Sequence, residues 1–339
     1  MARSTTPDQL GLFAPQRLDA ITPIVTDRDR ELATALPKMV RLGTSSWTFP
    51  GWGGVLYAGR PTKDALVRSG LSAYAAHPLF RTVGIDRSYY GPLTEADLRG
   101  YRDALASAPD FLAVSKVWGE LTSFVFRVGE RAGTRNPSFL DPERVQSEVL
   151  RPFEAAFTDH AGPFVFELPP IPEGALPSER TVPDAIERML ERLPSTFRYA
   201  FELRNRELLT KRYFDVLRAH RAAHCFNLWT AMPTVGLQLT IPGSITTDFV
   251  VCRLMLPPAT RYEAMKKSFE PFDRIVREQP EMREDVVALE ETCEELDVKA
   301  AFVLVNNKAE GSSPLTVRAL AEAIVKARRS RTAGAPSGP

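Results

Sequence analysis

The stretch PFVFELPP (163–170), followed by FRYAFELR (197–204), decides the fold of this chain. In each stretch an apolar run ends in charged residues. A strand of a parallel sheet is covered on both faces, so it reads as a continuous apolar run. Six further runs of this kind occur along the chain: VRLGTSS (40–46), RTVGID (81–86), FLAVSK (111–116), AHCFNL (223–228), DFVVCR (248–253) and AAFVLVNN (300–307).

Helix-like segments or long connections separate the eight runs. This alternation predicts an α/β fold, a (β/α)8 TIM-type barrel in a single domain, over residues 39–327. Residues 1–38 do not fit the alternation and are interpreted as an N-terminal extension that docks in part on the barrel. Residues 328–339, RRSRTAGAPSGP, lack apolar periodicity and are predicted to be a short disordered C-terminal tail.

The helices that join the strands carry start signals. Thr94 is the expected N-cap of a helix over 93–108, and Asp141 and Pro142 open another over 141–157. Further amphipathic helices are predicted over 183–193, 211–220, 284–296 and 313–327. Three connections are unusually long: 47–66, 117–140 and 229–247. All three follow strands, so they fall on the C-terminal face of the barrel, and long loops are often functional.

The composition is that of a soluble protein. The chain has 339 residues, 25% of them charged, and a net charge of +1, which gives no general attraction to nucleic acid or to a membrane surface. The three cysteines, Cys225, Cys252 and Cys293, form no CxxC pair, which indicates free thiols and a cytoplasmic location. No segment approaches the roughly 18 consecutive apolar residues of a transmembrane helix, and the N-terminus lacks a signal-peptide core.

In a (β/α)8 barrel the C-terminal strand ends carry the active site. Glu202 and Arg204 are two residues apart, so a strand directs both to one face. Glu202 is then a candidate acid–base group oriented by Arg204, and the alternative is a structural salt bridge. Glu167 precedes Leu168-Pro169-Pro170, where the prolines end the strand. It is either a second acid–base group or a residue that caps a turn or pairs with an arginine.

Three cations, Lys116, Arg204 and Arg253, are expected to converge on the same rim. Such a cluster suits a phosphate or carboxylate on a small anionic substrate. Alternatively, each cation neutralises a neighbouring carboxylate, because strand ends also carry Asp86, Glu167 and Glu202. An all-carboxylate Mg2+ site from those three acids is a further alternative. No HxH or HExxH spacing, Walker A sequence or GxGxxG motif occurs, so neither a metal nor a cofactor is predicted.

The last strand run ends in Asn306-Asn307-Lys308, and Gly311-Ser312-Ser313-Pro314 follows. This segment suits either an anion at a helix N-terminus or ordinary helix capping. Aromatic residues cluster after the first two runs, where they can stack on a base or sugar or plug the barrel. We assign Trp47, Tyr89 and Tyr90, together with Ser46, to substrate binding, and Trp52 and Tyr57 to a plug.

Seven ordered blocks resemble the YecE-like barrel family, known as domain of unknown function 72. They are GTSSWTFPGWGGVLY (43–57), GIDRSYY (84–90), FLAVSKVWGELT (111–122), FVFELPP (164–170), YAFELRNREL (199–208), DFVVCRLMLPP (248–258) and VLVNNKAEGSSPLT (303–316). The resemblance spans roughly 40–325 and implies a TIM-type barrel, without implying a reaction. A distant likeness of the family to endonuclease IV and sugar-isomerase barrels is a fold-level analogy.

Six polar positions match the family pattern unchanged: Lys116, Glu202, Arg204, Arg253, Asn306 and Asn307. Five positions depart from it. Asp86 stands where the family usually has Asn, Gly84 where it has Glu, Glu167 where it has Gln, Met255 where it has His, and Lys308 where it often has His. The resemblance therefore gives a barrel mouth with fewer imidazoles and more carboxylates than the family usually has.

These features lead to one functional expectation and two alternatives. The expectation is an enzyme that acts on an anionic substrate, with Glu202, Arg204 and Lys116 as catalytic residues. The substrate-binding set is Ser46, Trp47, Asp86, Tyr89, Tyr90, Glu167, Arg253, Asn306 and Asn307. The alternatives are a protein that binds nucleic acid, with phosphates on the cations and bases on the aromatics, and a barrel without catalytic activity that binds a partner.

Overall fold

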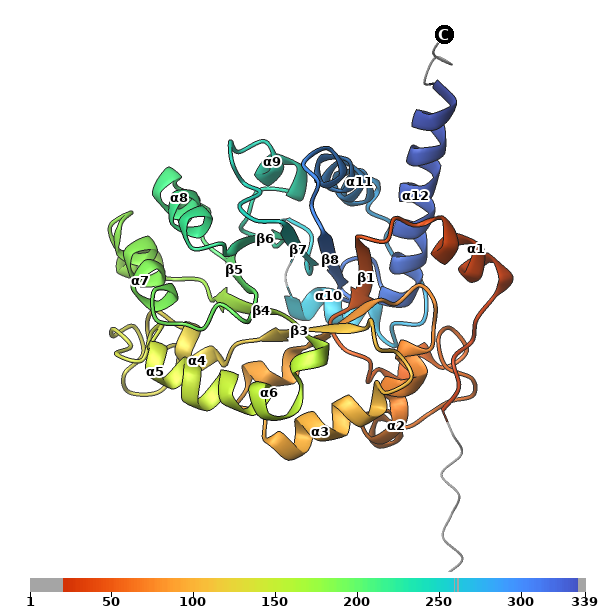
Figure 1. The fold of residues 1–339 in the computed structure, drawn as a ribbon, viewed down its shortest axis with the longest axis horizontal. Coiled ribbons are helices and arrows are strands. Elements are labelled where there is room, and N and C mark those ends of the chain that lie inside the picture. Colours follow the sequence, from red (N-terminus) through yellow and green to blue (C-terminus); the bar gives the residue numbers. More distant parts are fainter. Residues whose placement is uncertain (1–20, 259, 261, 335–339) are drawn as a thin grey trace, which may run out of the picture.

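The structure, a computed structural model, describes residues 21–258, 260 and 262–334. Eight parallel strands pair in chain order and close into a barrel (Figure 1). They are β1 (Val40–Thr44), β2 (Thr82–Ile85), β3 (Leu112–Lys116), β4 (Ala161–Leu168), β5 (Tyr199–Leu203), β6 (Ala223–Leu228), β7 (Phe249–Leu254) and β8 (Ala300–Val305). The predicted (β/α)8 fold is confirmed.

The helices lie around this ring, apart from Tyr262–Phe269, which projects onto its centre (Figure 1). They are α1 (Asp27–Ala35), α2 (Lys63–Ala75), α3 (Glu95–Ala104), α4 (Gly119–Thr122), α5 (Pro142–Arg144), α6 (Arg151–Ala156), α7 (Thr181–Leu190), α8 (Lys211–Ala219), α9 (Val235–Leu239), α10 (Tyr262–Phe269), α11 (Pro280–Glu295) and α12 (Ser313–Gly334). A π-helical turn, Val145–Leu150, joins α5 to α6. Short 3-10 turns lie at Pro50–Trp52, Asp86–Tyr89, Thr158–His160, Glu173–Ala175 and Arg206–Leu208.

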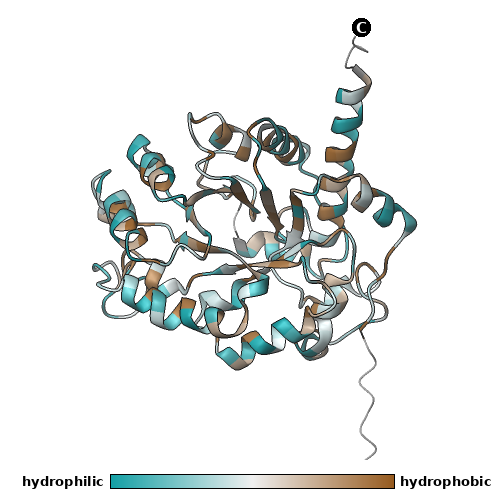
Figure 2. Ribbon diagram, viewed as in Figure 1, coloured by the Kyte–Doolittle hydropathy of each residue, from teal (hydrophilic) through white to brown (hydrophobic). Residues whose placement is uncertain are grey.

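The start signals of two helices are confirmed. Thr94 caps α3 in a reciprocal capping box with Asp97, and the Asp141 side chain accepts from the Arg144 amide at the start of α5. The long connection 229–247 contains only the short helix α9. Figure 2 shows the helices banded in hydrophilic and hydrophobic colours, as expected for helices with one face on the core.

Two buried clusters divide the apolar core. The larger one lies between the strands and the surrounding helices. The smaller one contains only strand residues and fills the barrel interior, with Val114, Val165, Ala200, Cys225 and Val251 among its members. Side chains alternate between the two faces of a strand. The residue two positions after a member of the smaller cluster therefore also points into the barrel.

Both ends of the chain differ from expectation. The C-terminal prediction of disorder over 328–339 is wrong for residues 328–334, because α12 continues to Gly334. Arg328 and Arg331 form ion pairs with Glu290 and Glu294 of α11. These ion pairs fasten the last turns of α12 to α11, although the sequence there has no apolar face that would pack on it. Residues 335–339 lie outside the described part of the chain.

The described part of the N-terminal extension contains α1, and residues 1–20 lie outside the description. The fully buried carboxylate of Asp29 in α1 accepts from Arg318 of α12, at 2.7 and 3.0 Å. The expected docking of the extension is therefore present, and it is made against the last helix.

Candidate functional site

Five charged or polar residues at strand ends point inward. Each lies two residues beyond a member of the interior apolar cluster, so it occupies the next inward position on its strand. The pairs are Val114 and Lys116, Val165 and Glu167, Ala200 and Glu202, Cys225 and Asn227, and Val251 and Arg253. The interior apolar layer therefore supports a layer of charged and polar groups directly above it.

Glu167 and Glu202 are direct register neighbours on β4 and β5. Two adjacent carboxylates repel one another unless cations lie between them. Arg204 Nη2 lies 3.2 Å from Glu167 Oε2 and 2.5 Å from Glu202 Oε1, the latter an ion pair without hydrogen-bond geometry. Arg253 Nη1 donates to Glu167 Oε2 at 2.9 Å and also to Glu202 Oε2. Two guanidiniums thus bridge the acidic pair.

Glu202 is the most enclosed member of this cluster. It is 0% exposed, and each of its oxygens faces one of the two arginines. Arg204 and Arg253 are themselves 3% and 1% exposed. The predicted pairing of Glu202 with Arg204 is present, and Arg253, two strands along the barrel on β7, completes it.

Glu167 is the shared anion of three cations, because Lys116 Nζ lies 2.8 Å from the same Oε2 atom. Burial alone would raise the pKa of Glu167, but the charges of Arg204, Lys116 and Arg253 lower it well below its ordinary value. The carboxylate is therefore ionised at neutral pH. The side chain of Glu167 is 14% exposed, so it lies nearer to solvent than Glu202.

Asp86 and Lys116 form the outer edge of the cluster. Both Asp86 oxygens accept from Arg253 Nη2 at 3.2 Å, and Lys116 Nζ lies 3.7 Å from Asp86 Oδ2. Their side chains are 27% and 11% exposed. Lys116 Nζ also lies 4.8 Å from the centre of the Tyr89 ring, a cation–π contact. Burial, followed by the charge of Glu167, raises the pKa of the Tyr89 hydroxyl.

Arg204 retains hydrogen-bonding capacity. Its Nε and Nη1 atoms are buried and have no partner among the described residues. The guanidinium carbon lies 3.9 Å from the centre of the Trp229 ring, so this indole covers the group. Arg204 also lines a cavity of about 590 Å3 between the segments that follow β5 and β6, with Asn205, Thr230 and Met232 among the other lining residues.

Lys308 and Trp229 are absent from the substrate-binding set drawn from the sequence. Lys308 is 7% exposed, and burial lowers the pKa of its amine to about 8, with the charges of Lys266 and Lys116 in the same direction and Asp86 and Glu263 opposing them. Glu263 and Lys266 belong to α10, which projects onto the centre of the strand ring in Figure 1. The position of Lys308 after the eighth apolar run was the available sequence signal, whereas nothing in the local pattern singled out Trp229.

Other predicted site residues make their contacts with residues outside the charged cluster. The Asn307 side chain accepts from Ser313 N at 2.9 Å and Ser313 Oγ at 2.7 Å, so it caps α12, and it also accepts from Trp52 Nε1 at 3.1 Å. Of the two interpretations of the segment 306–314, an anion site or helix capping, these contacts correspond to helix capping. Trp47 is buried against the edge of Tyr101.

The remaining members form local contacts or are exposed. Ser46 Oγ bonds with Thr48 Oγ1 at 3.0 Å, and Asn306 Oδ1 accepts from Lys308 N at 3.1 Å. Tyr90 is 85% exposed and meets the Tyr89 ring edge-on. Trp52 and Tyr57, expected to form a plug, are both fully buried.

In the part of the chain that the structure describes, no three His, Cys, Asp or Glu side chains are grouped so that they could hold a metal ion. The three acids of the alternative Mg2+ site, Asp86, Glu167 and Glu202, all face cationic side chains instead. Cys225, Cys252 and Cys293 are free and buried, as expected. Among the described residues, no helix has both the length and the apolar content needed to cross a membrane.

Comparison with known proteins establishes the family. Residues 41–338 match the model of the protein family of unknown function DUF72. The chain belongs to this family. The expectation drawn from the seven sequence blocks is thereby confirmed. No curated protein matches the chain.

Two solved structures of DUF72 family proteins resemble this barrel. One, from Thermotoga maritima, is 22% identical, covers 84% of this chain and 98% of that chain, and has a TM-score of 0.59. The other, from Enterococcus faecalis, is 15% identical, covers 85% of this chain and 96% of that chain, and has a TM-score of 0.60. At these identities the likeness concerns the fold.

Proposed function

We propose that this chain is an enzyme that acts on a small substrate bearing a carboxylate or phosphate group, at the C-terminal mouth of the barrel. The observation that carries the proposal is Arg204, a buried guanidinium with two unpartnered donors among the described residues, at the edge of a cavity of about 590 Å3. A buried donor without a partner costs about 1–3 kcal/mol. An anionic group that accepted from Arg204 would remove this cost, and the Trp229 indole above the guanidinium would have to turn to admit it.

The exposure of each member supports a division of roles. Lys116, with its contacts to Asp86 and Glu167, is the outermost of the three cations and meets the substrate anion first. Arg253 forms ion pairs with Asp86 and Glu167, the two carboxylates that also contact Lys116 and orient it. The complete burial of Glu202 between two guanidiniums supports a positioning role for this residue rather than the acid–base role expected from sequence. The half-buried Asn306, at the end of β8, contributes an amide to the same rim.

Proton transfer is assigned to Lys308 in this proposal. Its pKa of about 8 means that a sizeable fraction of the amine is neutral in mildly alkaline solution, and an acid–base group works best when its pKa is near the working pH. Glu167, by contrast, has a pKa well below its ordinary value and is a weak base. We expect the turnover of a true substrate to rise with pH through an inflection near 8.

The test is a thermal-shift screen of phosphorylated and carboxylated metabolites, followed by mass spectrometry of each stabilising compound to detect turnover. The expected result is at least one compound whose affinity falls about tenfold or more in Lys116→Gln, because a charge-assisted bond to the anion is lost. Arg204→Gln leaves two buried carboxylates short of a cation and can fail to fold. The double variant Glu202→Gln/Arg204→Gln removes one charge of each sign and serves as the second probe.

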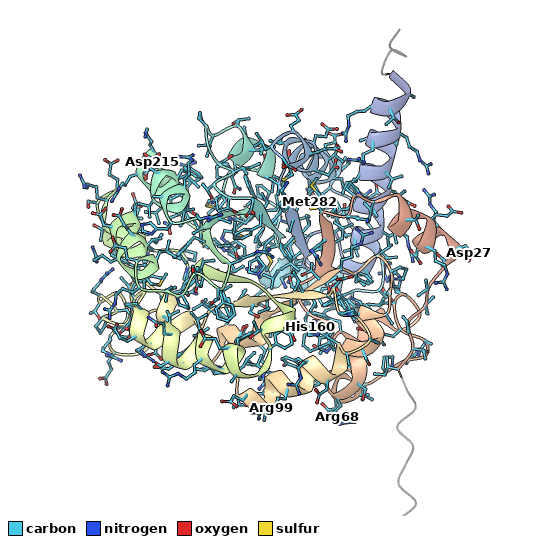
Figure 3. The ribbon with its side chains drawn as sticks, in the orientation of Figure 1. Asp27, Arg68, Arg99, His160, Asp215 and Met282 are labelled. Carbon is cyan, nitrogen blue, oxygen red and sulfur yellow. The ribbon has the colours of Figure 1, made fainter. Side chains whose placement is uncertain are left out.

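The matched control is Arg68→Gln, which removes an exposed cation on the outer surface of α2 (Figure 3). If every stabilising compound bound Lys116→Gln, the double variant and Arg68→Gln with wild-type affinity, the mouth would not be the anion site. Binding without turnover of any compound would favour a barrel that recognises a ligand or partner without catalysis.

A second candidate function rests on Tyr90, which is 85% exposed and meets the ring of Tyr89 edge-on, while the Lys116 amine lies over that Tyr89 ring. An exposed aromatic ring beside a cation suits a single-stranded nucleic acid, with a base on the ring and a phosphate on the amine. Titration of a single-stranded oligonucleotide over a salt series tests this. Affinity that falls with salt and is weakened by Tyr90→Ala supports it, and absence of binding at low salt removes it.

A further inference from the structure

A second cavity, of about 540 Å3, lies at the opposite end of the barrel from the charged mouth. Arg41 at the start of β1, Arg81 just before β2, and Asp110 and Phe111 just before β3 contribute to its walls, so it lies at the N-terminal ends of three adjacent strands. Lys38, from the link between α1 and β1, also lines it. None of these residues belongs to the mouth.

The two arginines of this cavity are held by backbone carbonyls. Arg41 Nη1 donates to the carbonyl of Asp110 at 2.7 Å. Arg81 donates to the carbonyls of Pro37, Val40 and Ala33, at 2.9, 3.2 and 2.5 Å. Carbonyls fix the position of a guanidinium but carry no net charge, so the positive charges here are not neutralised.

Carboxylates are scarce around these cations. In the described part of the chain, Lys38, Arg41, Arg81 and the nearby Arg198 have no ion pair, whereas all three cations of the mouth do. The side chains that line the cavity include three cations and one acid, Asp110. Burial, followed by the charge of Arg198, lowers the pKa of the Arg41 guanidinium, and Asp110 opposes this. An anion in the cavity would relieve this repulsion.

His77 adds no charge to the lining. Burial lowers the pKa of its imidazole to about 4, so the ring is neutral at pH 7. Its Nδ1 atom accepts from Leu79 N at 3.4 Å, and its Nε2 atom faces Asp29 Oδ2 at 3.6 Å, so both ring nitrogens are engaged elsewhere. The imidazole therefore presents only its ring to the cavity.

The rest of the lining is apolar. Phe80 and Phe111 are 3% and 4% exposed, and small apolar or proline side chains complete the wall: Ala75, Pro78, Ala108 and Pro109. An inorganic ion would contact the cations and leave this apolar wall unused. A cavity of this size, apolar on one side and cationic on the other, is in the range of small-molecule sites, which are about 300–1,000 Å3.

We propose that this cavity is a second binding site, which takes a small amphipathic anion whose phosphate or carboxylate lies on Lys38 and Arg41 and whose apolar ring lies on the more accessible apolar residues of the lining, Ala75, Pro78, Ala108 and Pro109. The N-terminal face of a TIM barrel ordinarily serves stability. Here unneutralised cations at that face reduce stability by self-repulsion. The bound anion therefore stabilises the folded protein as well as occupying the cavity.

The test is isothermal titration of the full chain with phenyl phosphate, inorganic phosphate and phenol. We expect phenyl phosphate to bind most tightly and phenol not to bind. In the double variant Lys38→Gln/Arg41→Gln, affinity for phenyl phosphate should fall about tenfold or more, because two charge-assisted contacts are lost. Lys38→Glu, at an exposed position, is the variant that keeps the fold and should weaken binding severalfold.

Lys116→Gln and Arg68→Gln are the controls, and circular dichroism melting checks that each variant folds. Lys116→Gln disables the proposed mouth and should retain phenyl phosphate binding, which separates this site from the proposed function. The proposal is overturned if the affinity is lost in Lys116→Gln instead, or if it is the same in wild type and in both cavity variants. Equal affinity for phenol and phenyl phosphate would also overturn it.

Discussion

At the scale of single residues, Glu167 holds the charged mouth together. Lys116, Arg204 and Arg253 all contact its Oε2 atom, from three different strands or strand ends. Removing one partner of a buried ionic network leaves the other charges without a counter-charge. The resulting loss of folding free energy exceeds the net stabilisation that the intact network provides. Glu167 is therefore the residue at which the network is most sensitive to substitution.

We predict that Glu167→Gln lowers the free energy of unfolding at pH 7 by about 3 kcal/mol. Because the folded pKa of Glu167 lies well below 4.5, its contribution is fully present above that pH. As the pH falls below 4.5, the unfolded chain takes up the proton first, so the stability difference between wild type and variant should narrow. Urea denaturation of wild type and variant at pH 7 and at pH 3.5 measures the loss of unfolding free energy and its decrease at low pH.

The control for this prediction is Glu173→Gln, which neutralises an exposed carboxylate in a 3-10 turn after β4. This variant should stay within about 0.5 kcal/mol of wild type at both pH values. A Glu167→Gln protein as stable as Glu173→Gln at pH 7 would mean that the three cations do not depend on the shared anion.

At the scale of elements, the start of α12 depends on a residue outside the helix. The Asn307 side-chain oxygen accepts from Ser313 N, Ser313 Oγ and Trp52 Nε1, and Asn307 is 2% exposed. A lost N-terminal cap costs about 1 kcal/mol, and each buried donor left unpaired adds about 1–3 kcal/mol. Asn307→Ala should therefore lower the free energy of unfolding by about 2–4 kcal/mol.

Thermal melting and tryptophan emission measure this effect, since Trp52 loses its partner. Asn307→Asp keeps the acceptor oxygen and should be milder. The neighbour Asn306 is half-buried, and its side-chain oxygen accepts from the backbone amide of Lys308, so Asn306→Ala is the matched control. Equal losses in Asn306→Ala and Asn307→Ala would contradict the capping role.

Most elements could be predicted because their signals are local. The strands follow from continuous apolar runs, and α3 follows from Thr94 at its cap. The additional turns of α12 could not be predicted in this way, because Arg328 and Arg331 are held by acids of α11 that are remote in the sequence. Trp47 was assigned to the mouth from its place after β1, but its ring packs on Tyr101, and a side chain's direction within a loop has no periodic signal.

The same distinction applies to the candidate site. The pairing of Glu202 with Arg204 follows from their spacing on one strand, since inward positions alternate. The bridge from Arg253 to Glu202 and Glu167 depends on barrel closure and on the register of four strands, which the local pattern does not contain. The depressed pKa of Lys308 likewise depends on burial beside side chains that the barrel brings together.

At the scale of the whole molecule, the first helix, α1, meets the start of the last helix, α12, beside the seam between β1 and β8. Asp29 of α1 is fully buried, accepts from Arg318 of α12 and from Thr26, and lies 3.6 Å from His77. Burial alone would raise the pKa of Asp29, but the hydrogen bonds from Arg318 and Thr26 lower it to about 2. This carboxylate therefore ties the N-terminal extension to the barrel through its ionised form.

We predict that Asp29→Asn lowers the free energy of unfolding by about 3–5 kcal/mol at pH 7, because Arg318 loses its buried partner. Asp27→Asn is the matched control, since Asp27 is in the same helical turn but exposed at the periphery (Figure 3). The contribution of Asp29 is complete above its unfolded pKa of 3.8 and is lost as the pH falls toward about 2. Urea denaturation at pH 7, 5.5 and 2.5 should thus show a stability difference that is constant between the first two pH values, where His77 (pKa about 4) stays neutral in the folded protein, and smaller at the third. A difference that stayed constant to pH 2.5, or that Asp27→Asn reproduced, would mean that α1 is held by apolar packing and not by this ion pair.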